Sequence, residues 1–320
     1  MIEPMNFISL KKRDTNMNII LAMVAAFFWG TTYAVTQYSL DGWPPLLLGA
    51  IRALPAGLLL LLIKPSLPKG KDWVVLLRLG AINIALFFGL LFIMAQTLPS
   101  AISAMGMVYV PVFAMCFHWL VNKKKPAKLQ LISGALLIVL AWQLFDPQKV
   151  QLNGVGLVAM LSAIGCIVIG SNLTQSLSNR IHWWTVLTWQ LILGGSLLAI
   201  LAALQATVYP AQYSNAIGNV SVLNTIGLLW LVILNTALAY SLYVWLLSRM
   251  TVVEFTFAGV TNPIAGILMG LLLMGESFSL HQYSLMVAII LTSLLSPLFA
   301  KYKHRKTLKR VEEPSLSTAK

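Results

Sequence analysis

Ten apolar runs follow one another along the chain, and they limit its fold more than any other feature. Each run has roughly 18–24 residues, enough to cross the ~30 Å hydrocarbon core of a bilayer as an α-helix. The runs lie at about 17–38, 45–63, 73–95, 99–120, 128–145, 153–173, 183–204, 223–247, 252–274 and 280–300. Most connections are short, so neighbouring helices must be antiparallel. Because only 10% of the residues are charged, against about 25% in soluble domains, the sequence predicts an all-α, polytopic membrane protein.

The two halves of the chain resemble one another at an offset of 152 positions, which is the distance from Pro111 to Pro263. The same offset joins Asn83 to Asn235, Leu86 to Leu238 and Gln130 to Gln282. Polar residues and prolines are rare in such runs, so their recurrence indicates a duplication. A unit of five helices ends on the opposite side of the membrane from its start, so the second copy is inverted. We therefore predict two inverted five-helix repeats, 17–147 and 153–300, between an N-terminal tail, 1–16, and a basic C-terminal tail, 301–320.

Basic residues are distributed unevenly between the two sides of the predicted membrane. The loops on one side carry only Lys149, whereas the side of both termini carries Lys11, Lys12, Arg13, Lys64, Lys69, Lys71, Arg78, Lys123, Lys124, Lys125, Lys128, Arg180, Arg249 and the cluster from Lys301 to Arg310. This asymmetry predicts cytoplasmic termini and external loops at 39–44 and 205–222. The net charge of +13 is thereby explained by topology and by anionic lipids, without a nucleic-acid partner.

Charged groups are nearly absent from the helix centres. The carboxylates all lie in loops, tails or helix ends, which argues against a buried proton relay and against tight binding of a polyvalent cation. Glu276, at the outer end of the ninth run, is expected to be a structural cap or a surface group. Arg52 lies about two turns inside the second run, and we expect it to snorkel to the outer interface; the alternative is that it attracts an anionic group of a substrate.

Polar and aromatic side chains at mid-membrane depth are the candidates for a substrate-binding site. They are Trp29, Thr32, Asn83, Phe87, Tyr109, Asn235, Tyr240, Tyr243 and Asn262. An unpaired amide in hydrocarbon costs several kcal/mol, so each asparagine must face a partner or a cavity. Bonding between helices is the structural alternative for each of them. Because Asn83 and Asn235 are equivalent in the two repeats, we expect both to face one central cavity.

Recognisable catalytic and metal-binding patterns are missing. The chain has no Gly-x-Ser-x-Gly, no His-Glu-x-x-His and no phosphate-binding glycine loop, and its four histidines are scattered. Cys116 and Cys166 lie singly inside apolar runs and are interpreted as packing residues. The sequence thus predicts no enzyme, no cofactor and no metal site.

Several short motifs resemble those of the EamA branch of the drug/metabolite transporter superfamily. They are Phe28-Trp29-Gly30, Pro44-Pro45 with Arg52-Ala53, Ala101 to Phe113, Val260 to Ile264, Gly275-Glu276 and Leu280 to Gln282. The sequence departs from the family pattern at Lys123-Lys124, at Thr31-Thr32 and at Ile164-Gly165. The resemblance implies a bacterial inner-membrane carrier with a cavity lined by helices of both halves.

The leading functional hypothesis is a secondary transporter that exports small neutral or zwitterionic metabolites, such as amino acids, by alternating access. Drugs, sugars and carboxylates are alternative substrates for the same fold, and a non-transporting membrane scaffold is the alternative class. The expected partners are a small-molecule substrate and membrane lipids. The oligomeric state stays open and is compatible with a monomer.

Overall fold

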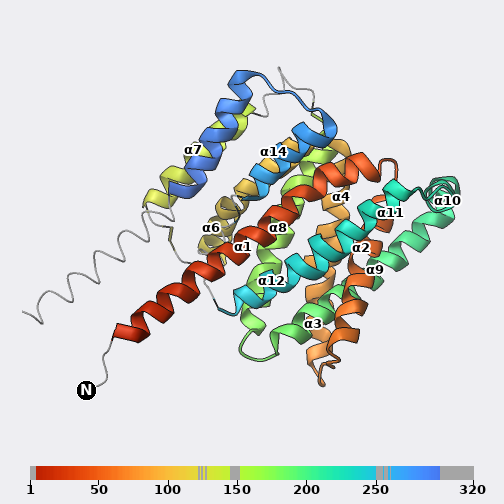
Figure 1. Ribbon diagram of the computed structural model, residues 1–320, viewed down its shortest axis with the longest axis horizontal. Helices are drawn as coiled ribbons and strands as arrows, with labels where there is room; N and C mark the ends of the chain where they lie inside the picture. Colours follow the sequence, from red (N-terminus) through yellow and green to blue (C-terminus); the bar gives the residue numbers. More distant parts are fainter. Residues whose placement is uncertain are drawn as a thin grey trace, which may run out of the picture.

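The computed structural model describes residues 5–121, 123, 125–126, 128–144, 152–249, 255, 259 and 261–295 (Figure 1). The side chains of 5–16, 118, 130 and 141 lie outside this description. Every regular element among the described residues is a helix. Seven helices are long and apolar enough to cross a membrane. Three shorter apolar helices occupy the other expected positions, and they are Leu131–Leu144, Thr261–Met274 and Leu280–Leu295. The all-α, polytopic prediction is confirmed.

The first half contains five predicted spans, two of which are interrupted by non-α turns. Its elements are α1 (Met5–Ser39), α2 (Pro45–Ile63), α3 (Asp72–Gly80), the π-helix η1 (Ala81–Leu86), α4 (Phe87–Thr97), α5 (Ser100–Gly106), the 3₁₀ turn η2 (Met107–Tyr109), α6 (Val110–Leu120) and α7 (Lys128–Leu144). The elements α3, η1 and α4 form one continuous span, Asp72–Thr97.

The second half repeats this order. Its elements are α8 (Gly154–Leu177), α9 (Trp183–Val208), α10 (Pro210–Gly218), α11 (Val222–Leu229), the π-helix η3 (Trp230–Leu238), α12 (Ala239–Leu247) and α14 (Thr261–Met274), followed by the helix Leu280–Leu295. Here α11, η3 and α12 form the continuous span Val222–Leu247.

The structure corrects two predicted boundaries. The first helix begins at Met5, inside the segment that we expected to be a polar tail, because nothing after Pro4 breaks a helix. The predicted loop 205–222 contains α10, whose first residue is Pro210; proline is favoured at a helix start because its missing N–H would be unpaired there anyway. The expected start of the ninth helix, 252–254, and the end of the tenth, 296–300, lie outside the described residues.

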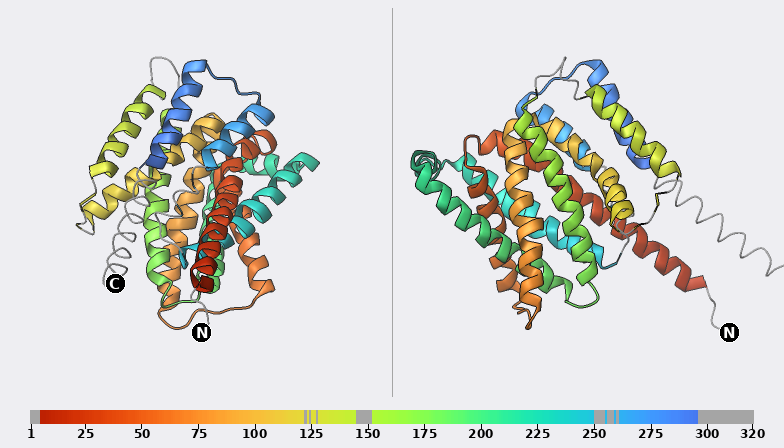
Figure 2. Two further views of the ribbon diagram at one scale, coloured as in Figure 1. Left: turned by 60° about the vertical axis from the view of Figure 1, so that its left-hand side comes forward. Right: turned by 180° about the vertical axis from the view of Figure 1, so that it is seen from behind.

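The helices of the two halves make reciprocal contacts. The first helix of the first half, α1, packs against α14, η3 and α12, which all belong to the second half. Correspondingly, the first helix of the second half, α8, packs against α6, η1 and α4 of the first half. The helices α2 and α9, which hold equivalent places in the repeats, pack directly on each other. In Figure 2, α7 and the helix Leu280–Leu295 lie together at one edge of the bundle. Such an exchange of equivalent contacts is the arrangement expected of inverted repeats.

The two π-helices occupy equivalent positions and contain the equivalent asparagines, Asn83 in η1 and Asn235 in η3. A π-turn widens a helix and frees backbone groups for other partners. In η3, the carbonyl oxygen of Asn235 accepts hydrogen bonds from Trp29 Nε1 at 3.1 Å and from Arg52 Nη2 at 3.3 Å. The irregular turn of η3 therefore holds two side chains of the first half, Trp29 and Arg52.

Glu276 caps a helix of the other half. Its carboxylate accepts hydrogen bonds from the backbone N–H of Ser100 at 2.6 Å, from Ser100 Oγ at 2.8 Å and from the N–H of Ala101 at 3.1 Å, all at the start of α5. A negative charge here pairs the free N–H groups and complements the helix dipole. The expectation that Glu276 is a structural cap is confirmed.

This cap leads to a prediction about Glu276. Glu276→Gln keeps one acceptor oxygen and should lower the unfolding midpoint slightly, whereas Glu276→Ala removes the cap and should destabilise by about 1 kcal/mol. Transport per folded molecule should be retained in Glu276→Gln, because a cap needs no exchangeable proton. Thermal unfolding together with flux in proteoliposomes measures both quantities. A folded Glu276→Gln variant without flux would show that the carboxylate carries protons.

Candidate functional site

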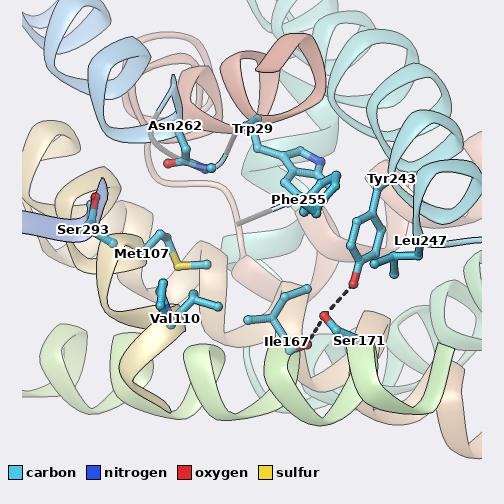
Figure 3. A pocket seen from close by; sticks show the side chains of 14 residues that line it. Trp29, Met107, Val110, Ile167, Ser171, Tyr243, Leu247, Phe255, Asn262 and Ser293 are labelled. Atoms are coloured by element: carbon cyan, nitrogen blue, oxygen red, sulfur yellow. Dashed lines mark hydrogen bonds between the residues drawn. The ribbon is translucent and has the colours of Figure 1, made fainter. Parts of the chain in front are cut away.

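A cavity of about 110 Å³ lies between the two halves, and we call it the wide cavity (Figure 3). It is lined by Ala26, Trp29, Met107, Val108, Val110, Pro111, Ile167, Ser171, Tyr243, Leu247, Phe255, Gly259, Asn262 and Ser293. The first half contributes α1, η2 and α6, and the second half contributes α8, α12, α14 and the last helix. Figure 3 shows Met107, Asn262 and Tyr243 arranged around the same space. The lining is largely apolar, with a few polar groups, as is usual for small-molecule sites.

Equivalent breaks in the two repeats form part of this wall. The 3₁₀ turn η2 ends directly before Val110 and Pro111. It interrupts the α-helix there because proline has no N–H to donate to the backbone of the preceding turn. In the second half, α14 begins at Thr261, two residues after a turn at Gly259, and has Pro263 in its first turn. The wall residues Val110 and Asn262 are equivalent under the 152-position offset. The duplicated prolines thus place irregular backbone where it borders a cavity, a setting in which a bilayer tolerates it.

A second cavity of about 40 Å³ adjoins the first, and we call it the arginine cavity. It is lined by Trp29, Thr32, Tyr33, Arg52, Phe87, Leu91, Met107, Ile167, Tyr240 and Asn262. Four of these residues, Trp29, Met107, Ile167 and Asn262, also line the wide cavity. The two cavities therefore form one site with an apolar part and a charged part.

Four aromatic rings connect the two parts. The ring centroid of Trp29 lies 5.2 Å from that of Tyr240, 5.1 Å from that of Tyr243 and 6.2 Å from that of Phe255. The rings of Tyr240 and Tyr243 are 5.8 Å apart. The Tyr243 hydroxyl forms a 2.6 Å hydrogen bond with Ser171 Oγ on α8, shown in Figure 3. This aromatic cluster offers ring faces to an apolar group or to an ammonium.

Arg52 is buried, with 2% of its surface exposed. Its Nε donates to Thr236 Oγ1 at 2.8 Å and its Nη2 to the carbonyl of Asn235 at 3.3 Å. Its guanidinium carbon lies 4.3 Å from the centroid of the Phe88 ring. The prediction that Arg52 snorkels to the interface is wrong, because the carbonyl and hydroxyl of η3 and an aromatic face hold the charge between the halves.

The counterpart of Arg52 in the second repeat is neutral. The two positions are matched by counting from the start of each helix. Arg52 is the eighth residue of α2, which starts at Pro45, and Gln190 is the eighth residue of α9, which starts at Trp183. Just as Arg52 binds η3, Gln190 Oε1 accepts a 2.9 Å hydrogen bond from Asn83 Nδ2 in η1. The duplicated framework therefore carries a positive charge in only one of its two equivalent positions.

The structure brings most of the predicted site residues together. Those that line one or both cavities are Trp29, Thr32, Phe87, Tyr240, Tyr243 and Asn262. Tyr109 is buried in η2 between two residues of the wide cavity, Val108 and Val110, but it does not line that cavity itself. Whether these side chains bind substrate stays a prediction.

The structure places Asn83 and Asn235 at neither of the two described cavities, which corrects our expectation. Both are fully buried, and neither lines the wide cavity or the arginine cavity. Asn83 bonds to Gln190, whereas Asn235 donates from Nδ2 to Thr32 Oγ1 at 2.6 Å. Each amide thus joins its π-helix to a neighbouring helix, and Asn235 contacts three residues that line the cavities, namely Thr32, Trp29 and Arg52.

Sequence reasoning missed three polar residues of this region. Tyr33 lines the arginine cavity, Ser171 the wide cavity, and Gln190 contacts Asn83. Gln190 had a recognisable signal, since it is an amide inside an apolar run. In the described part of the chain, no group of three or more His, Cys, Asp or Glu side chains is placed to hold a metal ion.

Comparison with known sequences decides the family. The sequence model of the EamA-like transporter family matches the chain twice, at residues 16–144 and at 154–297. The chain belongs to the EamA-like transporter family. The fold described above is therefore that of a polytopic EamA-like protein with an internal repeat.

Individual relatives extend over nearly the whole chain. Protein PecM of Dickeya dadantii (strain 3937) is 32% identical over 298 residues, which cover 91% of this chain and 96% of PecM. The uncharacterized inner membrane transporter YedA of Escherichia coli (strain K12) is 26% identical, with 86% of this chain and 88% of YedA covered. A protein of known crystal structure has the same fold, with a TM-score of 0.65 at 14% identity over 90% of this chain and 98% of that one.

Proposed function

We propose that this EamA-like protein is a secondary transporter that exports small zwitterionic metabolites such as amino acids. In this proposal it acts in the bacterial inner membrane, with both termini in the cytoplasm, and alternates access by rocking one repeat against the other. The name of the relative YedA supports the membrane assignment, and the lysine and arginine asymmetry supports the orientation.

The observation that carries the proposal is the composite site between the repeats. Its apolar part has room for a small aliphatic or aromatic side chain, and its aromatic cluster suits an ammonium group. Asn262 borders both cavities, and its Oδ1 has no hydrogen-bond partner among the described residues, so an ammonium could donate to it. A membrane scaffold would need neither the cavity nor these polar groups.

Transport by purified protein in proteoliposomes tests this proposal. Vesicles preloaded with unlabelled leucine, phenylalanine or threonine should accumulate the same labelled amino acid by exchange, whereas protein-free vesicles should not. Labelled glucose and ethidium serve as comparison substrates for the sugar and drug alternatives. Exchange of either of these without any amino-acid exchange would replace the proposed substrate class, and a folded protein that exchanges nothing would favour the scaffold.

A further inference from the structure

The unused hydrogen-bonding groups of the arginine cavity define what it can hold. Arg52 Nη1 and Tyr240 Oη are both buried, and neither has a hydrogen-bond partner among the described residues. Both side chains line the same cavity. A buried donor without a partner costs free energy, and more so when it is charged. The cavity therefore offers two donors to a ligand that accepts.

No described carboxylate neutralises Arg52. Asp72 pairs with Arg180 at 2.8 Å, Glu276 is bound to the start of α5, and Asp41 is exposed after α1. The contacts that Arg52 does make, to Thr236, to the Asn235 carbonyl and to Phe88, hold the guanidinium in place without cancelling its charge. A fixed cation that no described carboxylate pairs with attracts an anion strongly beside a cavity, because the surroundings have a low dielectric constant.

We propose that the arginine cavity is a subsite for one carboxylate group of the substrate, bound by Arg52 Nη1 and Tyr240 Oη. A singly charged group fits because the described residues that line the two cavities include no second basic side chain. The volume of about 40 Å³ has room for a small polar group. The planar guanidinium matches the geometry of a carboxylate, and a hydrogen bond from a charged donor to a charged acceptor is stronger than one between neutral groups.

This inference rests on the proposed function for its biological meaning, and it adds orientation to it. A carboxylate at Arg52 points the rest of the substrate past Trp29 into the wide cavity, since Trp29 lines both spaces. The carboxylate then distinguishes amino acids from amines, sugars and cationic drugs of similar size. Specificity of this kind is strong, because an analogue that lacks the charged group leaves Arg52 unpaired.

The test measures binding without requiring transport. Unfolding of the detergent-solubilised protein is followed with leucine, isovalerate, isoamylamine or inorganic phosphate at equal ionic strength. Leucine and isovalerate, which carry the carboxylate, should raise the unfolding midpoint, and isoamylamine and phosphate should not. In Arg52→Lys, which keeps the charge but loses the planar group, the apparent affinity for isovalerate should fall about tenfold, or about 1.4 kcal/mol. In Arg52→Gln the isovalerate shift should disappear.

Arg249 provides the matched control, because it is exposed and its guanidinium carbon lies 4.1 Å from the Trp245 ring centroid, a stacking similar to that of Arg52. Arg249→Lys should respond to isovalerate like the wild type. Equal shifts with isoamylamine or phosphate, an undiminished isovalerate shift in Arg52→Gln, or no shift with either carboxylate would overturn the inference. If the wild-type protein exchanged no amino acid but isovalerate still raised its unfolding midpoint, only the proposed function would be contradicted.

Discussion

Trp29→Ala is expected to reduce transport per folded molecule by about tenfold or more, which corresponds to a rise of about 1.4 kcal/mol in the free-energy barrier to transport. Trp29 borders both cavities and contacts the rings of Tyr240, Tyr243 and Phe255. Its indole N–H also holds the carbonyl of Asn235. Alanine removes the shared wall and a face for an ammonium. Trp29→Phe keeps a ring and should have an intermediate effect. Initial exchange rates, normalised to folded protein, measure the loss.

Trp189 is the control for this substitution, because its surroundings are similar and it lies outside both cavities. Its Nε1 donates to the carbonyl of Ser66 at 2.7 Å, and its ring centroid lies 4.6 Å from that of Trp73. Trp189→Ala should lower stability while leaving transport per folded molecule within about twofold. If the two variants lost transport equally, Trp29 would be a packing residue rather than part of the site.

Gly30→Ala should strongly reduce the amount of folded protein, because α1 and α14 cross with their backbones in contact at this point. A Cβ atom on Gly30 would collide with the carbonyl oxygen of Asn262 and lie 2.8 Å from the Cβ of Ala265. Neither neighbour is the free end of a flexible side chain, so α14 must move as a whole. Overpacking of this kind costs about 1–3 kcal/mol. Size-exclusion profiles and unfolding midpoints in detergent measure the effect.

Gly165 allows the same substitution without the collision. It lies within α8, and a Cβ atom built on it has no neighbour within 4 Å. Gly165→Ala should therefore fold as well as the wild type, since alanine also favours a helix more than glycine does. Equal losses in the two variants would mean that α1 and α14 do not cross as closely as described.

The fold could be predicted largely because lipid leaves few choices. Apolar length determines the spans, and the odd number of helices in each repeat determines the inversion. The irregular turns were less accessible. Proline favours a break in a helix at 111 and 263, but nothing in the sequence distinguishes π-helices at Asn83 and Asn235 from regular turns. Such local geometry arises from contacts with distant helices, as in the bonds from Trp29 and Arg52 to Asn235.

The site was predicted in its residue types more than in its pairings. Six of the aromatic and polar side chains singled out at mid-membrane depth line one or both cavities, since polar groups buried there need a partner or a cavity. The role of Arg52 was misjudged, because snorkelling was the favoured interpretation for an arginine about two turns inside a membrane helix. Its partners, Thr236 and Phe88, lie on other helices and cannot be inferred from spacing. Equivalence in sequence also placed Asn83 and Asn235 in one cavity, whereas each faces its own neighbour.

The unmatched positive charge in α2 has an electrical consequence. The equivalent position in α9 is the neutral Gln190. When the two repeats exchange conformations during transport, the charge that α2 moves is therefore not balanced by an equal charge on α9. A charge that crosses the whole membrane field does work of about 2.3 kcal/mol per 100 mV. Any rearrangement that carries Arg52 through part of that field therefore makes the return of the empty carrier sensitive to membrane voltage. A bound carboxylate would cancel that sensitivity, because its negative charge would move together with the positive charge of Arg52.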